Sequence, residues 1–342
     1  MASGLRRLLI IGGTGTLGSA ILHKLLATHA HQFDSIRILS RNEHRQKWME
    51  RNFKPLAQQV GVDLDFFLGD IGDRDRVFRA CRHVTDVFHL AAIKHVDKAE
   101  YNPHEAVRTN VIGTINIIDA CIHHDVQRAI FTSTDKAVEP FNTYGFSKAL
   151  AESLWVAGNM GLPTTRFSAV RYGNVFGSQG SVVELWRNLQ TLGKPLTITH
   201  PEATRFFISI GDAAKLVYNA WSDMQRGEVF IPKMKATALL PLVNLFDGKF
   251  TVTGMGPGEK MHEALVSPHE AHRVYESNGY FVKMPSYHFF DAEIPTGATP
   301  FPGGKYTSDI APQFTKDELK IMLAEVMGTW TALGFTNSAA TT

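Results

Sequence analysis

A short polar stretch in the middle of the chain carries several groups that can donate or accept protons. Residues 133–136 read Ser-Thr-Asp-Lys, and Tyr144 and Lys148 follow at YxxxK spacing. Residues at positions i and i+4 share one face of a helix, so we expect the Lys148 ammonium to lie near the Tyr144 phenol and to lower its pKa. Tyr144 is then a candidate acid or base for a sugar or alcohol hydroxyl, with Thr134 sharing the hydrogen bond.

The adjacent pair Asp135 and Lys136 points to a second kind of chemistry. A plain dehydrogenase or an epimerase does not need a carboxylate and an amine behind its hydride-transfer site. An elimination does, because one group must protonate a departing hydroxide while another removes a proton from carbon. The alternative interpretation is a solvent-exposed turn in which the two side chains form an ordinary ion pair.

A glycine-rich segment near the N-terminus is typical of a phosphate-binding turn. Residues 12–18 read Gly-Gly-Thr-Gly-Thr-Leu-Gly, directly after an apolar run and directly before a helical pattern. Glycines at this spacing allow a tight turn and a close backbone approach to a pyrophosphate, and the helix N-terminus offers N–H groups to the phosphates. The predicted cofactor contacts of this segment are Gly12, Thr14, Gly15, Thr16, Leu17 and Gly18.

Further candidate cofactor contacts follow the next expected strands. Ser40, Arg41 and Asn42 stand where an Asp or Glu would meet a free ribose 2′-hydroxyl, and Arg41 can instead pair with a 2′-phosphate. This favours NADP over NAD, with a solvated surface arginine as the alternative. Asp70 is a candidate cap for the adenine. The contacts expected after the third and fourth strands are Asp70 and Ile71, then Leu90, Ala91 and Ala92.

Alternating strands and helices must position these groups. Between residues 8 and 171, short apolar runs alternate with longer amphipathic segments. This rhythm predicts an α/β fold, a Rossmann-type doubly wound parallel sheet with helices on both faces. The expected strands are Leu8–Ile11, Ile36–Leu39, Leu64–Leu68, Val87–Leu90, Ala129–Thr132 and Ser168–Val170, and the expected helices include Leu17–Leu26, Arg74–Arg82, Glu105–Cys121 and Tyr144–Ala157.

The alternation of strand and helix patterns ends after Tyr172, where glycine, proline and threonine become frequent. We expect a smaller C-terminal lobe that closes over the carboxyl ends of the sheet, where open α/β sheets bind ligands. The expected division is an NADP-binding domain over residues 1–172, with further sheet segments from about 206–232, and a substrate-binding lobe over 173–205 and 233–342. Its expected elements are strands Leu196–Thr199 and Val229–Pro232 and helices Val182–Leu192, Ile210–Met224 and Thr315–Thr331.

The composition argues against several classes of protein. The 342 residues are 44% apolar and 20% charged with a net charge of +2, which is typical of a folded globular chain without the basic surface that nucleic acids need. We expect the two cysteines to be reduced core residues, and the 15 histidines lack the partner ligands of a metal site. Because neither a signal peptide nor a membrane-spanning run is evident, we expect a cytoplasmic protein.

With these motifs the chain resembles the extended short-chain dehydrogenase/reductase superfamily, and within it the soluble UDP-N-acetylglucosamine 4,6-dehydratases that invert C5. The Thr134-Asp135-Lys136 triplet is specific, because dTDP-glucose dehydratases carry Glu where Lys136 stands. Membrane-bound retaining relatives commonly have Met in place of Tyr144. The segments that carry the resemblance are residues 89–96, 133–138, 144–148, 171–175, 199–201, 204–207 and 257–263.

The resemblance implies a reaction cycle. Tyr144 takes the 4-hydroxyl proton as a hydride passes from C4 to NADP⁺, and Lys136 then removes the C5 proton. Asp135 protonates the departing 6-hydroxyl, the hydride returns to C6, and a proton reaches the opposite face of C5. The resemblance also implies cofactor contacts from Lys94, Thr109, Asn110, Tyr144 and Lys148, and substrate contacts from Lys94, Asn174, Val182, Thr199, Arg205 and Glu259.

One departure from the family pattern bears on the substrate. Relatives usually read Arg-Pro-Gly-Glu-Lys where this chain has Gly256 before Pro257, so an arginine that helps to grip the diphosphate is missing. Lys260 or Arg187 would have to replace it, or the substrate would have to differ. The expected partner is UDP-N-acetylglucosamine or a related UDP-sugar, and the expected assembly is a homo-oligomer. The alternatives are a nucleotide-sugar 4- or 5-epimerase and an NADP-binding regulatory protein.

Overall fold

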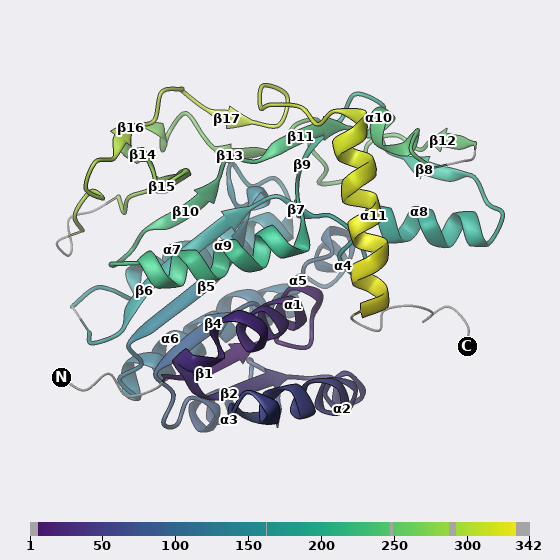
Figure 1. Ribbon diagram of the computed structural model, residues 1–342. Coiled ribbons are helices and arrows are strands. Elements are labelled where there is room, and N and C mark those ends of the chain that lie inside the picture. Colours follow the sequence, from purple (N-terminus) through teal and green to yellow (C-terminus); the bar gives the residue numbers. More distant parts are fainter. Residues whose placement is uncertain (1–5, 162, 247–248, 287–291, 333–342) are drawn as a thin grey trace.

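The central feature is a twisted sheet that includes ten strands among the described residues (Figure 1). The computed structural model describes residues 6–161, 163–246, 249–286 and 292–332, so the outer ends of both expected domains lie outside it. The strands that lie between β3 at one edge and β10 pair with one another in parallel. The order is β3 (Asp63–Leu68), β2 (Phe33–Ser40), β1 (Arg6–Ile11), β4 (Asp86–His89), β5 (Arg128–Thr134), β6 (Arg166–Tyr172), β10 (Val229–Pro232), β15 (Tyr280–Lys283), β14 (Val274–Ser277) and β16 (Thr299–Pro300).

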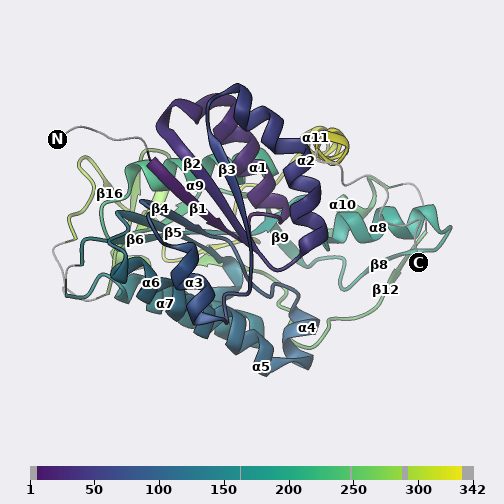
Figure 2. The ribbon, with the colours of Figure 1, turned by 90° about the horizontal axis from the view of Figure 1, so that it is seen from below.

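Helices cover both faces of this sheet, as Figure 2 shows from below. The chain moves outward from β1 through β2 to β3, then crosses to β4 on the other side of β1, and this reversal opens a crevice at the carboxyl ends of the strands. The predicted doubly wound α/β fold and its six strands are therefore confirmed. One face carries α1 (Thr16–Lys24), α2 (Glu43–Gln59) and α9 (Ile210–Asp223), and the other carries α3 (Arg74–Ala80), α6 (Gly113–His123) and α7 (Thr143–Ala157).

The inner strands are apolar along their whole length because helices cover them from both sides. Leu8, Leu9, Ile10 and Ile11 of β1 are all at most 1% exposed. Cys81 and Cys121 are free and buried, as expected for core residues. No helix within the described ranges has an apolar stretch long enough to cross a membrane.

Two parts of the main sheet layer were not anticipated. Antiparallel strands β15, β14 and β16 extend the sheet beyond β10, although they belong to the segment expected to form the lobe. Helix α2 was not singled out because its 17 residues are largely polar and include Pro55. Helix α9 and strand β10 lie with the sheet, in keeping with the sheet segments expected near 206–232, whereas β9 belongs to a separate sheet.

The lobe has an apolar core of its own. In Figure 1 its elements lie beside the carboxyl ends of the main sheet. Trp186, Phe176, Phe207 and Leu242 are buried in this core, together with Leu319 from the C-terminal helix. Its elements are β7 (Asn174–Val175), α8 (Val182–Thr191), β8 (Leu196–Ile198), β9 (Thr204–Ile208), β11 (Lys235–Ala238), α10 (Leu239–Val243), β12 (Phe250–Val252), β13 (Ala264–Val266), β17 (Tyr306–Thr307) and α11 (Lys316–Ala332). Short helical turns α4 (Val96–Tyr101) and α5 (Pro103–Ala106) lead into α6.

Candidate active site

A cleft of about 1780 Å³ lies between the carboxyl ends of the strands and the lobe. Single-ligand sites commonly measure about 300–1,000 Å³, so this cleft has room for two ligands. Asp70, Asn110 and Asp135 lie outside its lining. The cleft brings together the other expected site residues, which are Gly12, Thr14, Gly15, Thr16, Leu17, Gly18, Ser40, Arg41, Asn42, Ile71, Leu90, Ala91, Ala92, Lys94, Thr109, Thr134, Lys136, Tyr144, Lys148, Asn174, Val182, Thr199, Arg205 and Glu259.

The glycine turn after β1 is shaped to accept a phosphate group. Gly12 has a positive φ of 81°, and a Cβ there would meet the Ala91 backbone nitrogen at 2.8 Å. A Cβ on Gly18 would meet the Gly13 carbonyl oxygen at 2.4 Å, so this glycine allows the helix to pack onto the turn. Helix α1 has no side-chain cap and no acidic residue in its first turn. Its N-terminus therefore faces the cleft with N–H groups that suit a pyrophosphate.

The end of β2 and the start of α2 form a basic corner of the cleft. Asn42 caps α2 by accepting a hydrogen bond from the Arg45 backbone N–H at 2.9 Å, and both Arg41 and Arg45 line the cleft. Arg41 also pairs with Asp70 at 3.2 Å, and its side chain is 56% exposed. The Asp70 carboxylate accepts from the Gly72 N–H at 2.7 Å, and its expected role as an adenine cap stays a prediction.

The acid–base groups follow directly from the end of β5. Thr134 Oγ1 donates to Asp135 Oδ1 at 2.9 Å, and Lys136 Nζ donates to the same oxygen at 3.0 Å. Asp135 is fully buried, so the alternative of a solvent-exposed ion-paired turn is wrong. Burial raises the pKa of the Asp135 carboxyl. Burial alone would lower the pKa of Lys136, but the charges of Asp135 and Glu263 raise it above its ordinary value.

Helix α7 packs against the turn Asp135–Ala137 and places Tyr144 and Lys148 beside it. A Cβ on Gly145 would meet the Lys136 carbonyl oxygen at 2.4 Å, so the glycine permits this close packing. Lys148 Nζ donates to the Thr132 carbonyl at 2.7 Å, and burial lowers its pKa to about 7. Burial raises the pKa of Tyr144, partly offset by Lys136 and by a hydrogen bond with Thr134. Lys148 is not among the principal groups that shift the Tyr144 pKa here, so its expected effect on that pKa stays a prediction.

The lobe contributes one fixed cation to the cleft wall. Arg205 donates from its NH1 group to the carbonyls of Thr204 at 2.8 Å and Met261 at 3.1 Å. Lys260, a suggested replacement for the missing arginine, does not line the cleft, because its ammonium bonds to the Val138 carbonyl at 2.9 Å. Arg187 also lies outside the lining.

The remaining substrate-side groups hold one another in place across the cleft. Asn174 Oδ1 accepts from Lys136 Nζ at 3.1 Å, so this residue, expected at the substrate phosphate, also positions the amine. The Gln179 N–H donates to Thr16 Oγ1 at 3.2 Å, while its carbonyl accepts from Lys94 Nζ at 2.5 Å. Asn110, expected on the nicotinamide side, bonds to both the Ile93 backbone and Ser147.

Two charged residues near the cleft were missed by the sequence analysis. Arg45 stands one turn into α2, a helix that was not singled out. Glu263 lies 3.6 Å from Lys136 Nζ and is 4% exposed. The signal for Glu263 was present, because it ends the segment 257–263 that carries the family resemblance.

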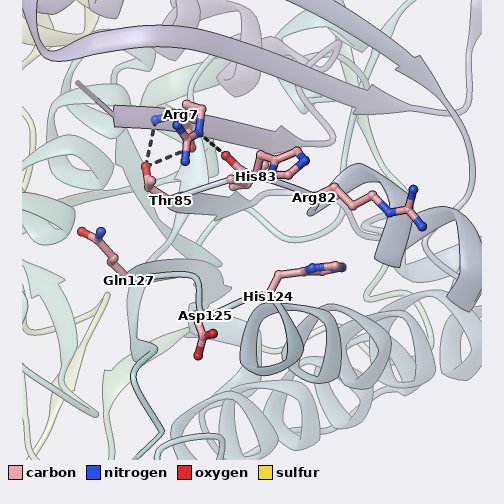
Figure 3. A pocket seen from close by; sticks show the side chains of 8 residues that line it. Arg7, Arg82, His83, Thr85, His124, Asp125 and Gln127 are labelled. Atoms are coloured by element: carbon pink, nitrogen blue, oxygen red, sulfur yellow. Dashed lines mark hydrogen bonds between the residues drawn. The ribbon is translucent and has the colours of Figure 1, made fainter. Parts of the chain in front are cut away.

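A second hollow, of about 580 Å³, lies at the opposite edge of the sheet, before the amino ends of β1, β4 and β5. Figure 3 shows Arg7 there, bonded to Thr85 and to the His83 backbone. Asp125 is the single carboxylate among the described lining residues, and no lysine accompanies it. The acid–base set lies in the larger cleft, where open α/β sheets bind their ligands. No group of three or more potential metal ligands occurs within the described part of the chain.

Comparison with known proteins agrees with this geometry. Residues 8–285 match the model of a family described as "Polysaccharide biosynthesis protein". The chain belongs to this family. It is 37% identical over 326 residues to the inverting UDP-N-acetylglucosamine 4,6-dehydratase of Campylobacter jejuni strain 81-176, covering 92% of this chain and 95% of that protein. The expected family resemblance is thus confirmed.

A solved structure and a second group of relatives complete the comparison. The X-ray structure of Pen from Bacillus thuringiensis shares 34% identity and a TM-score of 0.85, covering 96% of this chain and 99% of that one. A protein of Rickettsia massiliae named UDP-glucose 4-epimerase is 38% identical, covering 81% of this chain and 82% of that protein. Relatives of equal similarity therefore carry different activities, and the choice between them depends on the residues of the site.

Proposed function

We propose that the protein is a nucleotide-sugar 4,6-dehydratase that converts UDP-N-acetylglucosamine, or a related UDP-N-acetylhexosamine, with inversion at C5. The pair formed by the buried Asp135 and the half-buried Lys136, with 3.0 Å between Oδ1 and Nζ beside the cleft, is the observation that carries the proposal. Transient oxidation at C4 is sufficient for a 4-epimerase, which has no use for a second acid and base. Elimination of water from C5 and C6 requires both.

Each group is assigned a role that its position in the site allows. Tyr144, at the cleft wall, accepts the 4-hydroxyl proton as C4 is oxidised, and the 4-keto group then acidifies the C5–H bond. Lys136 takes the C5 proton as its amine. Asp135 lies behind the wall, so its proton reaches the departing 6-hydroxyl through the Thr134 hydroxyl, which lines the cleft and bonds to Oδ1 at 2.9 Å. The same groups return a proton to the opposite face of C5.

The glycine turn and the basic corner suit NADP. The nicotinamide, when bound, supplies the acceptor for the C4 hydride and its donor back to C6. Gly12 and the α1 N-terminus suit the pyrophosphate, and Arg41 and Arg45 suit a ribose 2′-phosphate.

The test is to incubate the purified protein with UDP-N-acetylglucosamine in heavy water and to follow the sugar by mass spectrometry and NMR. We expect loss of one water and deuterium at C5. Deuterium incorporation without water loss would indicate an epimerase. Bound NADP with no change in several UDP-sugars would favour a regulatory protein.

Cofactor choice can be tested at the basic corner. Arg45→Ala is expected to weaken NADPH binding about 10- to 100-fold, because a charge-assisted contact with phosphate is lost, and to leave NADH binding within about twofold. Fluorescence titration with both cofactors measures this. Arg51→Ala, an exposed arginine of the same helix, is the control. Equal weakening for both cofactors would contradict a 2′-phosphate contact.

The missing arginine can be restored. A Cβ on Gly256 would have Glu259 Cδ as its nearest neighbour at 3.6 Å, which is ordinary contact, and Gly256 lines the cleft. Gly256→Arg is expected to lower KM for the UDP-sugar about tenfold with little change in kcat, because a diphosphate contact acts equally on bound substrate and transition state. Gly256→Ala is the control for backbone effects. An unchanged KM would place the diphosphate elsewhere.

We also propose a homo-oligomer that pairs through the outer faces of α7 and the helical turn before α6. Apolar side chains are exposed there, with Phe146 58%, Leu150 51% and Ile112 44% accessible. Phe146→Glu is expected to shift the protein toward monomer in size-exclusion chromatography with light scattering. Leu192→Glu, on the lobe, should leave the mass unchanged. A monomeric wild-type protein would contradict the proposal.

A further inference from the structure

Lys136 faces a second carboxylate, which the lobe supplies. Glu263 precedes β13, and its Oε1 lies 3.6 Å from Lys136 Nζ, in addition to Asp135 Oδ1 at 3.0 Å and Asn174 Oδ1 at 3.1 Å. Glu263 is 4% exposed and does not line the cleft. It therefore contacts the amine without being in a position to touch the substrate.

The backbone at Glu263 is fixed from both sides. Its N–H donates to Ser308 Oγ at 2.9 Å, and its carbonyl accepts from the Ser308 N–H at 2.8 Å. Ser308 Oγ also bonds to Thr204 Oγ1 at 2.6 Å. Thr204 is in contact with His262 Nδ1 at 2.8 Å, so the imidazole is engaged beside Glu263 rather than with Lys136. This framework holds one carboxylate of the lobe against one amine of the sheet.

Two oxygens of this cluster are buried without a hydrogen-bond partner, Asp135 Oδ2 and Glu263 Oε2. A buried carboxylate oxygen that accepts nothing is costly, and protonation lowers that cost because it neutralises the carboxyl group. Burial, with Glu263 as a further cause, raises the pKa of the Asp135 carboxyl. Asp135 is also the carboxyl group that bonds to Thr134 at the cleft, so it is the one placed to deliver a proton. Lys136 is then left with a single charged partner.

We infer that Glu263 is a positioning residue whose carboxylate is the counter-charge of the Lys136 ammonium while Asp135 is protonated. The inference rests on the proposed dehydratase function. When the Lys136 amine takes the C5 proton, the C–H electron pair passes into the enolate and an ammonium forms. Asp135 still holds the proton destined for the 6-hydroxyl at that moment. The negative charge that faces the new ammonium from the protein is that of Glu263.

The same arrangement prepares the two groups for their roles. Transfer of one proton from Lys136 Nζ to Asp135 Oδ1, over 3.0 Å, yields an amine and a carboxylic acid with no change in the total charge of the cluster. Two further groups share the surroundings of Lys136. The charge of Arg205 lowers the Lys136 pKa, and the Tyr144 phenol lies in the same electrostatic environment.

The effect of Glu263 on proton transfer can be separated from an effect on folding. Glu263→Gln keeps the shape of the side chain and removes its charge. We expect C5 deuterium exchange to fall about 10- to 100-fold, and its pH profile to move about 1 to 3 pH units toward lower pH, because loss of a nearby anion lowers the pKa of both neighbours. Glu263→Asp keeps the charge, and its profile should stay near that of the wild type.

The C4 oxidation step distinguishes the possible outcomes. This step should persist in Glu263→Gln, and absorbance should show the formation of reduced nicotinamide. The control is Glu202→Gln, at an exposed glutamate of the lobe, which should behave as wild type in both steps. An unshifted profile in Glu263→Gln, or equal loss of both steps, would overturn the inference. Absence of dehydration in the wild-type protein would instead contradict the proposed function, so the two failures are distinguishable.

Discussion

Lys136→Ala is expected to bind NADP and the UDP-sugar and still to fail at dehydration, with C5 deuterium exchange reduced about 10²- to 10⁴-fold. The amine is the group proposed to take the C5 proton, and no other lysine among the described residues contacts Asp135, Glu263 or Asn174. The C4 oxidation step is expected to slow less, because the charge of Lys136 acts on Tyr144 only by lowering its pKa. Rapid mixing with absorbance, followed by NMR of the sugar, measures the two steps separately.

One control variant and two opposing outcomes belong to this experiment. Lys194→Ala, an exposed lysine of the lobe, should leave both steps at the wild-type rate. If Lys136→Ala still dehydrates at the parental rate, the C5 base is a different group and Asp135 becomes the first candidate. If the variant loses cofactor binding as well, Lys136 is structural, since Asp135 and Glu263 would then face each other without a cation.

Local patterns in the sequence were sufficient to predict the glycine turn and the segments that line the cleft beside it. The glycine spacing of residues 12–18 reflects a close backbone approach, such as that of Gly12 to Ala91. The alternation of strands and helices placed these segments at one edge of the sheet because parallel strands share their direction.

Contacts that join distant segments could not be predicted in the same way. Nothing near Glu263 in the sequence indicates that it faces Lys136, because a separate hydrogen-bonded framework in the lobe brings it there. The position of Lys148 was predicted, but its side chain bonds to the Thr132 carbonyl, an acceptor that helical spacing does not reveal. Strands β14 to β16 pair antiparallel at the sheet edge after a long irregular connection, so the alternating pattern did not include them.

A buried network of four charges connects these late strands to helix α7. Glu152 of α7 accepts from Arg171 at 2.6 Å and from Lys283 of β15 at 2.6 Å, and Arg171 also donates to Glu270 at 2.6 Å. The network is neutral, and its side chains are at most 11% exposed. Glu152 lies on the same face of α7 as Lys148, one turn further along. The network thus joins the extended sheet edge to the helix that carries Tyr144.

Glu152→Gln is expected to lower the free energy of unfolding by about 3 to 5 kcal/mol, because Arg171 and Lys283 would remain buried with Glu270 as their one carboxylate. Urea denaturation measures the change.

Burial alone would raise the pKa of Glu152, but Arg171 and Lys283 lower it well below the ordinary 4.5. A lowered folded-state pKa adds stability above the unfolded value, so the difference from wild type should be constant above that pH and shrink as the pH falls further. Glu276→Gln, which breaks an exposed pair with Lys233, should change stability by less than about 1 kcal/mol at every pH. Equal effects of the two variants would mean that the buried network does not hold α7 in place.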